Sequence, residues 1–232
     1  MRIAIAISGY ARTLHHCLPS FVEKVVQSNS TSEIEVFCCL WETSLGRVEK
    51  LNDPWHYKVE ALQRDTLESS EELRAFIEGI CNVKAHIKLI NNSQSQVLIN
   101  EGRNLGMQYP ELLSQYYMIS ESYEMTRKYS PDYCIRARPD MKIDNFPSLE
   151  SRSEFILSEY VWYDYHAKDG HENEMIWVSS SRISEKTFSA IKDVRSGSLL
   201  SGPQHGEAIT GRHFERISAT KERFNFGYRI AR

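Results

Sequence analysis

The sequence predicts an α/β protein with a mainly parallel sheet flanked by helices. From residue 2 to residue 137, short apolar segments of strand length alternate with longer segments whose apolar residues recur at helical spacing. The resulting order, β-α-β-α-β-α-β, is typical of a parallel sheet that is covered on both faces. The chain has 232 residues, of which 41% are hydrophobic, so it can form a substantial core. We expect one domain over residues 1–232.

The first part of the chain carries the clearer pattern. Runs of branched and aromatic residues predict strands, and apolar residues three and four apart predict helices. Pro110 is expected to begin a helix, and Pro139 is expected to end a strand because proline has no backbone N–H to donate. The predicted strands are 2–7, 35–41, 83–90 and 133–137, and the predicted helices are 19–27, 61–80 and 111–129.

The second part of the chain is less regular. Residues 160–173 form a polar and aromatic stretch that is interpreted as a loop, and residues 196–206 form a glycine-rich loop. The remaining expectations are strands at 155–158 and 175–178, helices at 182–194 and 207–217, and a strand-like tail at 224–231.

Composition argues against several classes of protein. The net charge of −3 indicates no basic surface for nucleic acid, and no apolar segment reaches the length of a membrane span. The five cysteines include no CxxC pair, and Cys38, Cys39 and Cys134 lie in apolar runs, so we expect buried free thiols and a cytoplasmic location. The motifs of a P-loop, a serine-hydrolase elbow and a zinc site are missing from the sequence.

The most informative stretch begins with the strand predicted at 133–137. Arg136 and Arg138 are two residues apart, so they share one face of the strand, and Asp140 follows directly after Pro139. Two guanidinium groups and a carboxylate therefore converge at a strand tip, which is what a site for a metal ion and a phosphorylated ligand requires. The alternative is an Arg–Asp ion pair that closes a turn. Taken alone, the stretch leaves both interpretations open.

Other polar residues are expected at the same edge of the sheet. The carboxyl ends of parallel strands form one rim, and ligands of such sheets bind there. Ser8, Gly9, Tyr10 and Arg12 follow the first predicted strand, and Trp41 ends the second. Gly9 permits a tight bend or a close approach of the backbone to a ligand, although the segment is not the GxGxxG fingerprint of dinucleotide sites. These positions strengthen the interpretation of the tip as a binding site.

Three segments recur together in one known group of proteins. They are Ser-Gly-x-x-Arg at Ser8, Gly9 and Arg12, Val-Phe-x-x-x-Trp at Val36, Phe37 and Trp41, and Asp-Tyr-x-Ile-Arg-x-Arg-Pro-Asp at 132–140. Residues 173–179, Phe188 and 203–207 match as well. This set resembles a group of GT-A-fold glycosyltransferases of polysaccharide biosynthesis in bacteria and large viruses. The resemblance extends over most of the chain, and its sharpest motif is Arg-x-Arg-Pro-Asp.

The resemblance implies a fold and an activity. The fold is a GT-A-like, Rossmann-like domain with a nucleotide-binding half at about 1–145 and an acceptor-side half at about 146–232. The activity is transfer of a sugar from a UDP- or GDP-linked donor to a hydroxyl of a glycan or surface polysaccharide. Such enzymes bind Mn²⁺ or Mg²⁺ through an Asp-x-Asp motif. Here Arg138 replaces the first aspartate, so either the metal ion or arginine can neutralise the leaving diphosphate.

The implied roles fall on a small set of residues. Asp140 is expected to hold the metal ion, with His205 as a further ligand. Glu207 is expected to activate the acceptor hydroxyl, because it begins a helix after a flexible loop and matches a glutamate of the resembling group; an ordinary first-turn glutamate is the alternative. Competing candidates for this catalytic role are Asp164, His171 and Glu172. The expected donor-binding residues are Ser8, Gly9, Tyr10, Arg12, Arg136, Arg138 and Asp140.

Two other functions stay open from the sequence. One is a nucleotidyltransferase on a similar sheet, although residues 8–13 lack the glycine-rich and basic loop that such an enzyme normally has. The other is a non-catalytic module that binds a nucleotide or a sugar, which the replacement of the first aspartate keeps open. Release of UDP or GDP from the donor distinguishes an enzyme from a binding module.

Overall fold

The structure is a computed structural model, and it describes residues 1–10, 14–42, 69–166, 171–224, 226 and 228–230. Two sheets form within these ranges. The strands of the large sheet are β1 (Arg2–Gly9), β2 (Glu33–Trp41), β3 (Lys84–Ile90), β4 (Tyr133–Ala137), β6 (Tyr160–His166), β7 (His171–Ser180) and β8 (Thr220–Arg223). The strands of the small sheet are β5 (Met141–Ile143) and β9 (Tyr228–Ile230).

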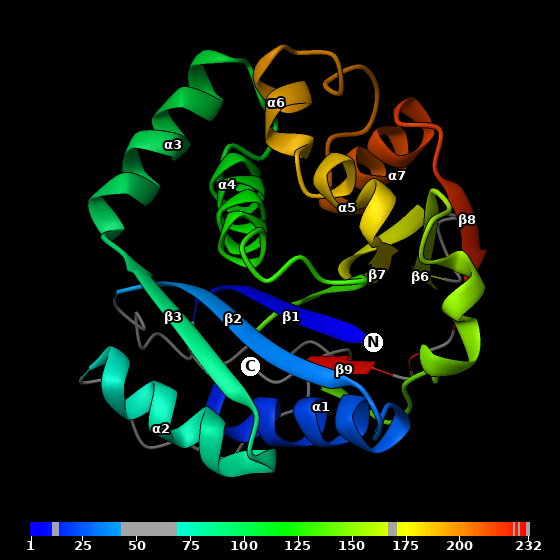
Figure 1. Cartoon of the computed structure of the whole chain (residues 1–232). Helices are drawn as coiled ribbons and strands as arrows, with labels where there is room; N and C mark the ends of the chain where they lie inside the picture. Colours follow the sequence, from blue (N-terminus) through cyan, green and yellow to red (C-terminus); the bar gives the residue numbers. More distant parts are fainter. Residues whose placement is uncertain (11–13, 43–68, 167–170, 225, 227, 231–232) are drawn as a thin grey trace.

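The large sheet is mixed and mostly parallel. Its order is β3-β2-β1-β4-β7-β6-β8. The β3–β2, β2–β1, β1–β4 and β6–β8 pairs are parallel, whereas β7 is antiparallel to both β4 and β6. Strands from both parts of the chain therefore join one sheet (Figure 1). The predicted α/β class, with a mainly parallel sheet between helices, is confirmed.

Helices cover both faces of the large sheet (Figure 1). In the described part of the chain, no helix has the length and apolar character needed to cross a membrane. On one face lie α1 (Leu14–Ser28), α2 (Ser70–Cys81) and the small sheet. On the other face lie α3 (Asn92–Asn104), α4 (Glu111–Thr126), α5 (Ser181–Thr187), α6 (Ala190–Arg195) and α7 (Gly206–Arg216). A short 3₁₀ helix, η1 (Glu150–Phe155), follows β5 along the chain.

The side chains of β1 show how the sequence divides between the two layers. Ile3, Ile5 and Ile7 belong to the core cluster on the α1 side, whereas Ala4 and Ala6 belong to the cluster on the α4 side. This division follows from the alternation of side chains along a strand, and all five residues are fully buried. The small alanine side chains leave space on the α4 face for the longer side chains of neighbouring strands.

Two segments around β6 were predicted incorrectly. Residues 155–158, predicted as a strand, form the end of η1 and a turn, because a short apolar run alone does not distinguish a strand from other buried structure. Residues 160–173, interpreted as a loop, belong largely to β6 and the start of β7. The aromatic residues of this stretch are strong β-formers, and they outweigh its polar residues.

Three other elements differ from the prediction, one because it was missed and two in their bounds. β8 was not predicted because its four residues are polar and charged, a composition typical of a strand at a sheet edge. The helix predicted at 182–194 is divided into α5 and α6. α1 begins at Leu14, so Pro19 lies inside this helix rather than near its start. The loop predicted at 44–57, and the first part of the helix predicted at 61–80, lie outside the described residues.

Candidate functional site

The tips of β1 and β4 lie side by side at the carboxyl rim of the sheet. The two strands are parallel and pair Ile7 with Ala137, so the residues that follow in each strand are neighbours. Gly9 has a φ of 136°, which residues with a side chain rarely adopt, and a Cβ there would lie 3.4 Å from Cδ of Pro139. The approach of Gly9 to Pro139 therefore brings together two segments that the sequence assigned to donor binding.

Arg138 and Asp140 form an ion pair at this tip. Nε and Nη2 of Arg138 donate to the two carboxylate oxygens of Asp140 over 2.9 and 2.7 Å. This bidentate geometry is the strong form of an arginine–carboxylate contact. The two side chains are 22% and 14% exposed, so the pair is largely shielded from water. The structure thus shows the ion pair that the sequence left as an alternative, and it places the pair on the rim.

Arg136 brings a positive charge to the interior beside the rim. Its side chain is 1% exposed and lies on the α4 face, next to Ala6 of β1. The guanidinium donates to the backbone carbonyl of Ala137 and lies 5.9 Å from the ring centre of Trp177 on β7. Because this environment has a low effective dielectric constant, the charge of Arg136 acts more strongly on nearby groups than it would in water.

Ser8 lies on the same face as Arg136. It follows the Ile7–Ala137 pair, so it is level with Arg138 across the β1–β4 pair. The Ser8 hydroxyl is buried and has no hydrogen-bond partner among the described residues. Buried hydroxyl groups are normally satisfied, so this one is a candidate for contact with a ligand.

Tyr10 is tied to two helices beside the rim. Its hydroxyl lies 3.4 Å from Oγ of Ser95 on α3, and Ser95 Oγ lies 3.2 Å from Oγ of Ser114 on α4. The Tyr10 ring is 6.2 Å from the ring of Trp41. Trp41 itself is buried in the core. Tyr10 therefore covers the end of the sheet in a fixed position.

The N-terminus of α7 lies at the same rim. α4 leads into β4, so the N-terminal end of α4 is at the carboxyl ends of the parallel strands. Near that end, the Tyr116 hydroxyl donates to the carbonyl of Gly206 over 2.9 Å and lies 3.0 Å from Oγ1 of Thr210. The backbone N–H of Gln108 donates to the Gln204 side chain over 2.8 Å. These contacts hold the start of α7 beside the N-terminal end of α4.

His205 and Glu207 form a pair at the start of α7. Nδ1 of His205 lies 3.0 Å from Oε2 of Glu207 and 3.4 Å from the backbone nitrogen of Ala208. An ionised carboxylate can only accept, so the shorter contact requires the proton on Nδ1, which makes Nε2 the accepting nitrogen of a neutral ring. The carboxylate and the imidazole orient each other, and such a pair can remove a proton from a hydroxyl.

The remaining predicted site residues are described only in part. Arg12 lies outside the described residues. Asp164 lies in β6, and His171 and Glu172 begin β7, so the structure describes the backbone of all three. Because β6 runs in the same direction as β4, these backbone positions lie towards the carboxyl rim.

Two neighbours of the site were not predicted. Trp177 and Tyr116 are each 1% exposed, and in the sequence both are typical of core residues. The hydroxyl of Tyr116, on an otherwise apolar helix face, is a signal that a partner was needed, because buried tyrosines usually find one. The indole N–H of Trp177 is buried without a partner in the described ranges, and only the structure reveals this.

Among the described residues, the groups around Asp140 do not make up the donor set of a divalent ion. Both carboxylate oxygens of Asp140 accept from Arg138, so a positive charge already lies against the carboxylate. Mg²⁺ and Mn²⁺ favour several oxygen ligands. Within the described ranges, no group of three or more His, Cys, Asp or Glu side chains is arranged to hold a metal ion. The ion expected at Asp140 and His205 stays a prediction.

Comparisons with known proteins give little beyond this geometry. No protein-family model matches the chain, and no curated protein matches it either. One similar solved structure is described as a "putative nucleotide-diphospho-sugar transferase" from Desulfovibrio desulfuricans G20. It is 9% identical, with a TM-score of 0.44, and the match covers 96% of this chain and 79% of that one. A match at this level says nothing about the activity of this chain. The fold and the rim define an α/β protein with an arginine-bearing site.

Proposed function

We propose that this protein transfers a sugar from a nucleotide-diphosphate sugar to an acceptor hydroxyl. One observation supports the proposal most directly. The Gly9–Pro139 contact and the Arg138–Asp140 ion pair lie side by side on one carboxyl rim. A backbone can approach a ligand closely at glycine, and guanidinium groups match the geometry of phosphate oxygens. Open parallel sheets bind their ligands at this rim. The resemblance of the Arg-x-Arg-Pro-Asp motif supports the same conclusion.

The proposed chemistry uses two parts of the rim. The bond between the sugar and the diphosphate breaks, and Arg138 and Arg136 stabilise the negative charge that develops on the diphosphate. The acceptor oxygen forms the new bond to the sugar, and its proton passes to Glu207. His205 holds the Glu207 carboxylate in position through the contact at 3.0 Å. The predicted glycan acceptor and the cytoplasmic location belong to this proposal.

The test is release of UDP or GDP from a panel of nucleotide sugars, with and without glycan acceptors. Glu207→Gln keeps the shape of the side chain but removes its basicity, so turnover should fall about 100- to 10,000-fold. Glu215→Gln is the matched control, because Glu215 is an exposed residue near the other end of α7. Normal turnover of Glu207→Gln together with loss in Asp164→Asn would move the role of base to Asp164.

The same assay distinguishes the two other functions. Tight binding of a nucleotide diphosphate without release from any donor indicates a non-catalytic module. Release of inorganic diphosphate from a nucleoside triphosphate and a sugar phosphate indicates a nucleotidyltransferase. Either result contradicts the proposed sugar transfer.

A further inference from the structure

The first two turns of α4 are attached to both sides of the rim. Oγ of Ser114 lies 3.2 Å from Oγ of Ser95 on α3, and Ser95 Oγ lies 3.4 Å from the hydroxyl of Tyr10, which is expected to bind the donor. Two residues further along α4, the Tyr116 hydroxyl donates to the carbonyl oxygen of Gly206 over 2.9 Å. Residues two apart on a helix do not face the same way. One side of α4 therefore reaches the donor side of the rim, and another side reaches the start of α7.

The contact of Tyr116 falls on the peptide group that leads into Glu207. The carbonyl of Gly206 and the backbone nitrogen of Glu207 belong to one peptide group, which is planar and rigid. A hydrogen bond to that carbonyl therefore fixes the plane from which the Cα of Glu207 extends. The Glu207 side chain is held separately, because its Oε2 lies 3.0 Å from Nδ1 of His205, the N-cap of α7. Tyr116 thus positions the backbone of the proposed base, and His205 positions its carboxylate.

The hydrogen bonds of Tyr116 have a defined direction. Its hydroxyl carries one proton and donates it to Gly206, so the contact of 3.0 Å with Oγ1 of Thr210 requires Thr210 to donate. Tyr116 and Thr210 are only 1% and 2% exposed. Hydrogen bonds are electrostatically stronger in such a buried place than in water. Tyr116 therefore fastens two successive turns of α7 to α4, and both helices lie on the same face of the sheet (Figure 1).

The hydroxyl of Tyr116 can be distinguished from its ring. The ring belongs to the core cluster on the α4 face, and phenylalanine would keep that packing. A hydroxyl adds nothing to the packing of an apolar helix face, and its burial is favourable only when it forms hydrogen bonds. Tyr116→Phe therefore removes the link to α7 while it leaves the core filled.

We propose that Tyr116 is a positioning residue of the sugar-transfer site, which holds Glu207 in a fixed place relative to the donor side of the rim. Tyr116 acts through Gly206 and does not itself contact the substrate. The inference rests on the proposed function, because that function gives Glu207 the role of base. Position matters for such a group, since a displacement of about 1 Å can cost about 100-fold in rate.

The first experiment compares kcat and KM of Tyr116→Phe and the wild type, with a donor and acceptor that the wild type turns over. We expect kcat to fall about 10- to 100-fold and KM for the donor to stay within about twofold, because only the placement of Glu207 changes. Tyr117→Phe is the matched control, since it removes a hydroxyl from the next, partly exposed residue of α4, and both constants should stay at the wild-type values. A wild-type kcat in Tyr116→Phe would overturn the inference.

A double-mutant cycle distinguishes positioning from a general effect on the fold. In the Glu207→Gln background, Tyr116→Phe should lower the residual turnover by less than about twofold, because it acts through Glu207 alone. A merely structural role would lower turnover by the same factor in both backgrounds. Equal losses in the two backgrounds would therefore contradict the inference.

Hydrogen–deuterium exchange tests the link without any turnover. Tyr116→Phe should accelerate exchange of the Ile209 and Thr210 amides in α7 about 2- to 10-fold, because one buried hydrogen bond no longer opposes local opening. Tyr117→Phe should leave this exchange unchanged. Unchanged exchange in Tyr116→Phe, or faster exchange with a wild-type kcat, would refute the inference alone. A wild type that turns over no nucleotide sugar would refute the proposed function, and the positioning role would fall with it.

Discussion

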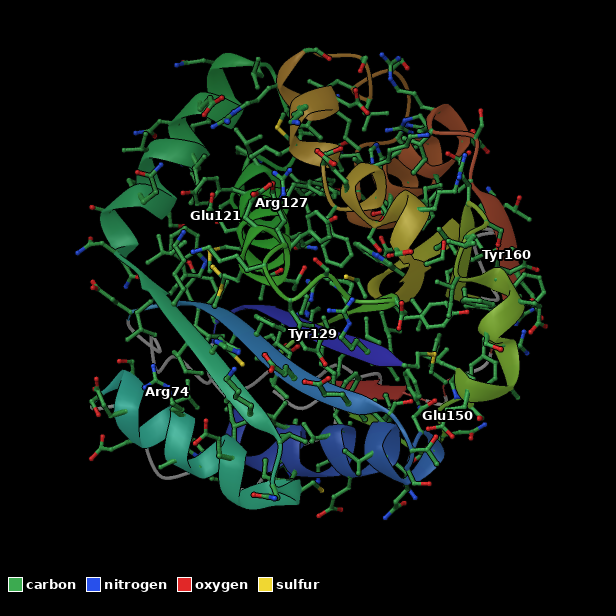
Figure 2. The ribbon with its side chains drawn as sticks, viewed as in Figure 1. Arg74, Glu121, Arg127, Tyr129, Glu150 and Tyr160 are labelled. Carbon is green, nitrogen blue, oxygen red and sulfur yellow. The ribbon has the colours of Figure 1, made fainter. Side chains whose placement is uncertain are left out.

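Glu222 on β8 connects three parts of the structure through one carboxylate. Its Oε2 accepts hydrogen bonds from the Tyr160 hydroxyl and the Trp162 indole N–H, both over 2.9 Å. Nη1 of Arg152 on η1 donates to the same oxygen over 3.2 Å. Tyr160 lies near the outer edge of the molecule (Figure 2). This carboxylate therefore attaches the edge strand to β6 and η1.

The pKa of Glu222 makes its contribution dependent on pH. Burial by itself raises this pKa, but the hydrogen bonds from Tyr160 and Trp162 and the charge of Arg152 outweigh burial, so the pKa lies below its ordinary value. The unfolded chain then takes up a proton at a higher pH than the folded protein does. The stabilisation is present above the ordinary carboxyl pKa and is lost as pH falls through the lower pKa of the folded state.

We expect Glu222→Gln to lower the free energy of unfolding by about 1 kcal/mol at pH 7, after allowance for the partial exposure of the side chain. Below about pH 4 the difference from the wild type should shrink, because the wild-type carboxylate is then becoming protonated. Urea unfolding across this pH range measures both effects. Glu23→Gln, on the exposed side of α1, is the control, and a constant difference at every pH would contradict the prediction.

Individual site residues could be predicted where the sequence places unusual chemistry beside a strand end. Arg138 and Asp140 could be predicted because Pro139 marks the end of β4, and an ion pair between them was one of the two interpretations of this stretch. The sequence offers His205 and Glu207 as separate candidates, and it does not indicate the contact between them. The contact of Arg136 with Trp177 depends on the antiparallel β4–β7 pair, and neither residue indicates that pairing in the sequence.

At the level of elements, α3 and α4 approach closely at one glycine. A Cβ on Gly102 of α3 would lie 2.8 Å from the carbonyl oxygen and 2.9 Å from Cα of Pro110, at the start of α4. Both are backbone atoms, so they cannot move aside as the end of a flexible side chain would. Gly79 of α2 is also helical, but no atom lies within 4 Å of the corresponding position.

The two glycines should therefore respond to alanine with opposite signs. Gly102→Ala should lower the free energy of unfolding by about 1–3 kcal/mol, because the helices must separate. Gly79→Ala should raise it by about 0.5–1 kcal/mol, because alanine favours the helix more than glycine does. Chemical denaturation of both variants provides the measurement. A stabilising Gly102→Ala would show that α3 and α4 do not approach each other in this way.

Helices and strands could be predicted where one pattern of residue types dominated the segment. β4 was predicted at its observed bounds, because Tyr133 to Ala137 are mostly β-formers and Pro139 follows shortly after them. β6 was missed because its polar residues resembled a loop. β8 was missed because an edge strand of Thr, Lys, Glu and Arg has no apolar pattern to detect. Both are stabilised by pairing with distant strands, and that information is not local in the sequence.

At the scale of the whole molecule, the burial of the cysteines shows how well the core excludes solvent. Cys17, Cys38, Cys39 and Cys134 are buried, and Cys81 is partly exposed. Burial raises the pKa of Cys134 to about 11 and that of Cys39 to about 12. Thiolate is the reactive form, so these groups react slowly for two reasons, lack of access and lack of ionisation.

We expect one thiol, that of Cys81, to react rapidly with a disulfide reagent at pH 8, and all five to react in denaturant. The four buried thiols should be modified together at the rate of global unfolding, because they lie in α1, β2 and β4 of the same packed structure. Cys81→Ser should remove the rapid phase. Rapid modification of two or more thiols in the native protein would contradict this prediction.

The overall architecture was predictable from the order of its elements, but the arrangement of the second part was not. Alternating strands and helices up to Ala137 predict the parallel half of the sheet. The insertion of β7 between β4 and β6 has no comparable signal, because an antiparallel partner can join a sheet at either edge. The rim was therefore predictable on the β1 and β4 side, and α7 could not be placed on it.

The pairing of β5 with β9 has a consequence for synthesis of the protein. β5 follows Asp140 directly, and its partner β9 lies far along the chain at Tyr228–Ile230. On a ribosome, β1 to β4 can assemble while later residues are still being made. The segment that leaves the Arg138–Asp140 tip gains its partner strand only when β9 emerges. A nascent chain therefore acquires the parallel strands β1 to β4 early and the full support of the Arg138–Asp140 tip late.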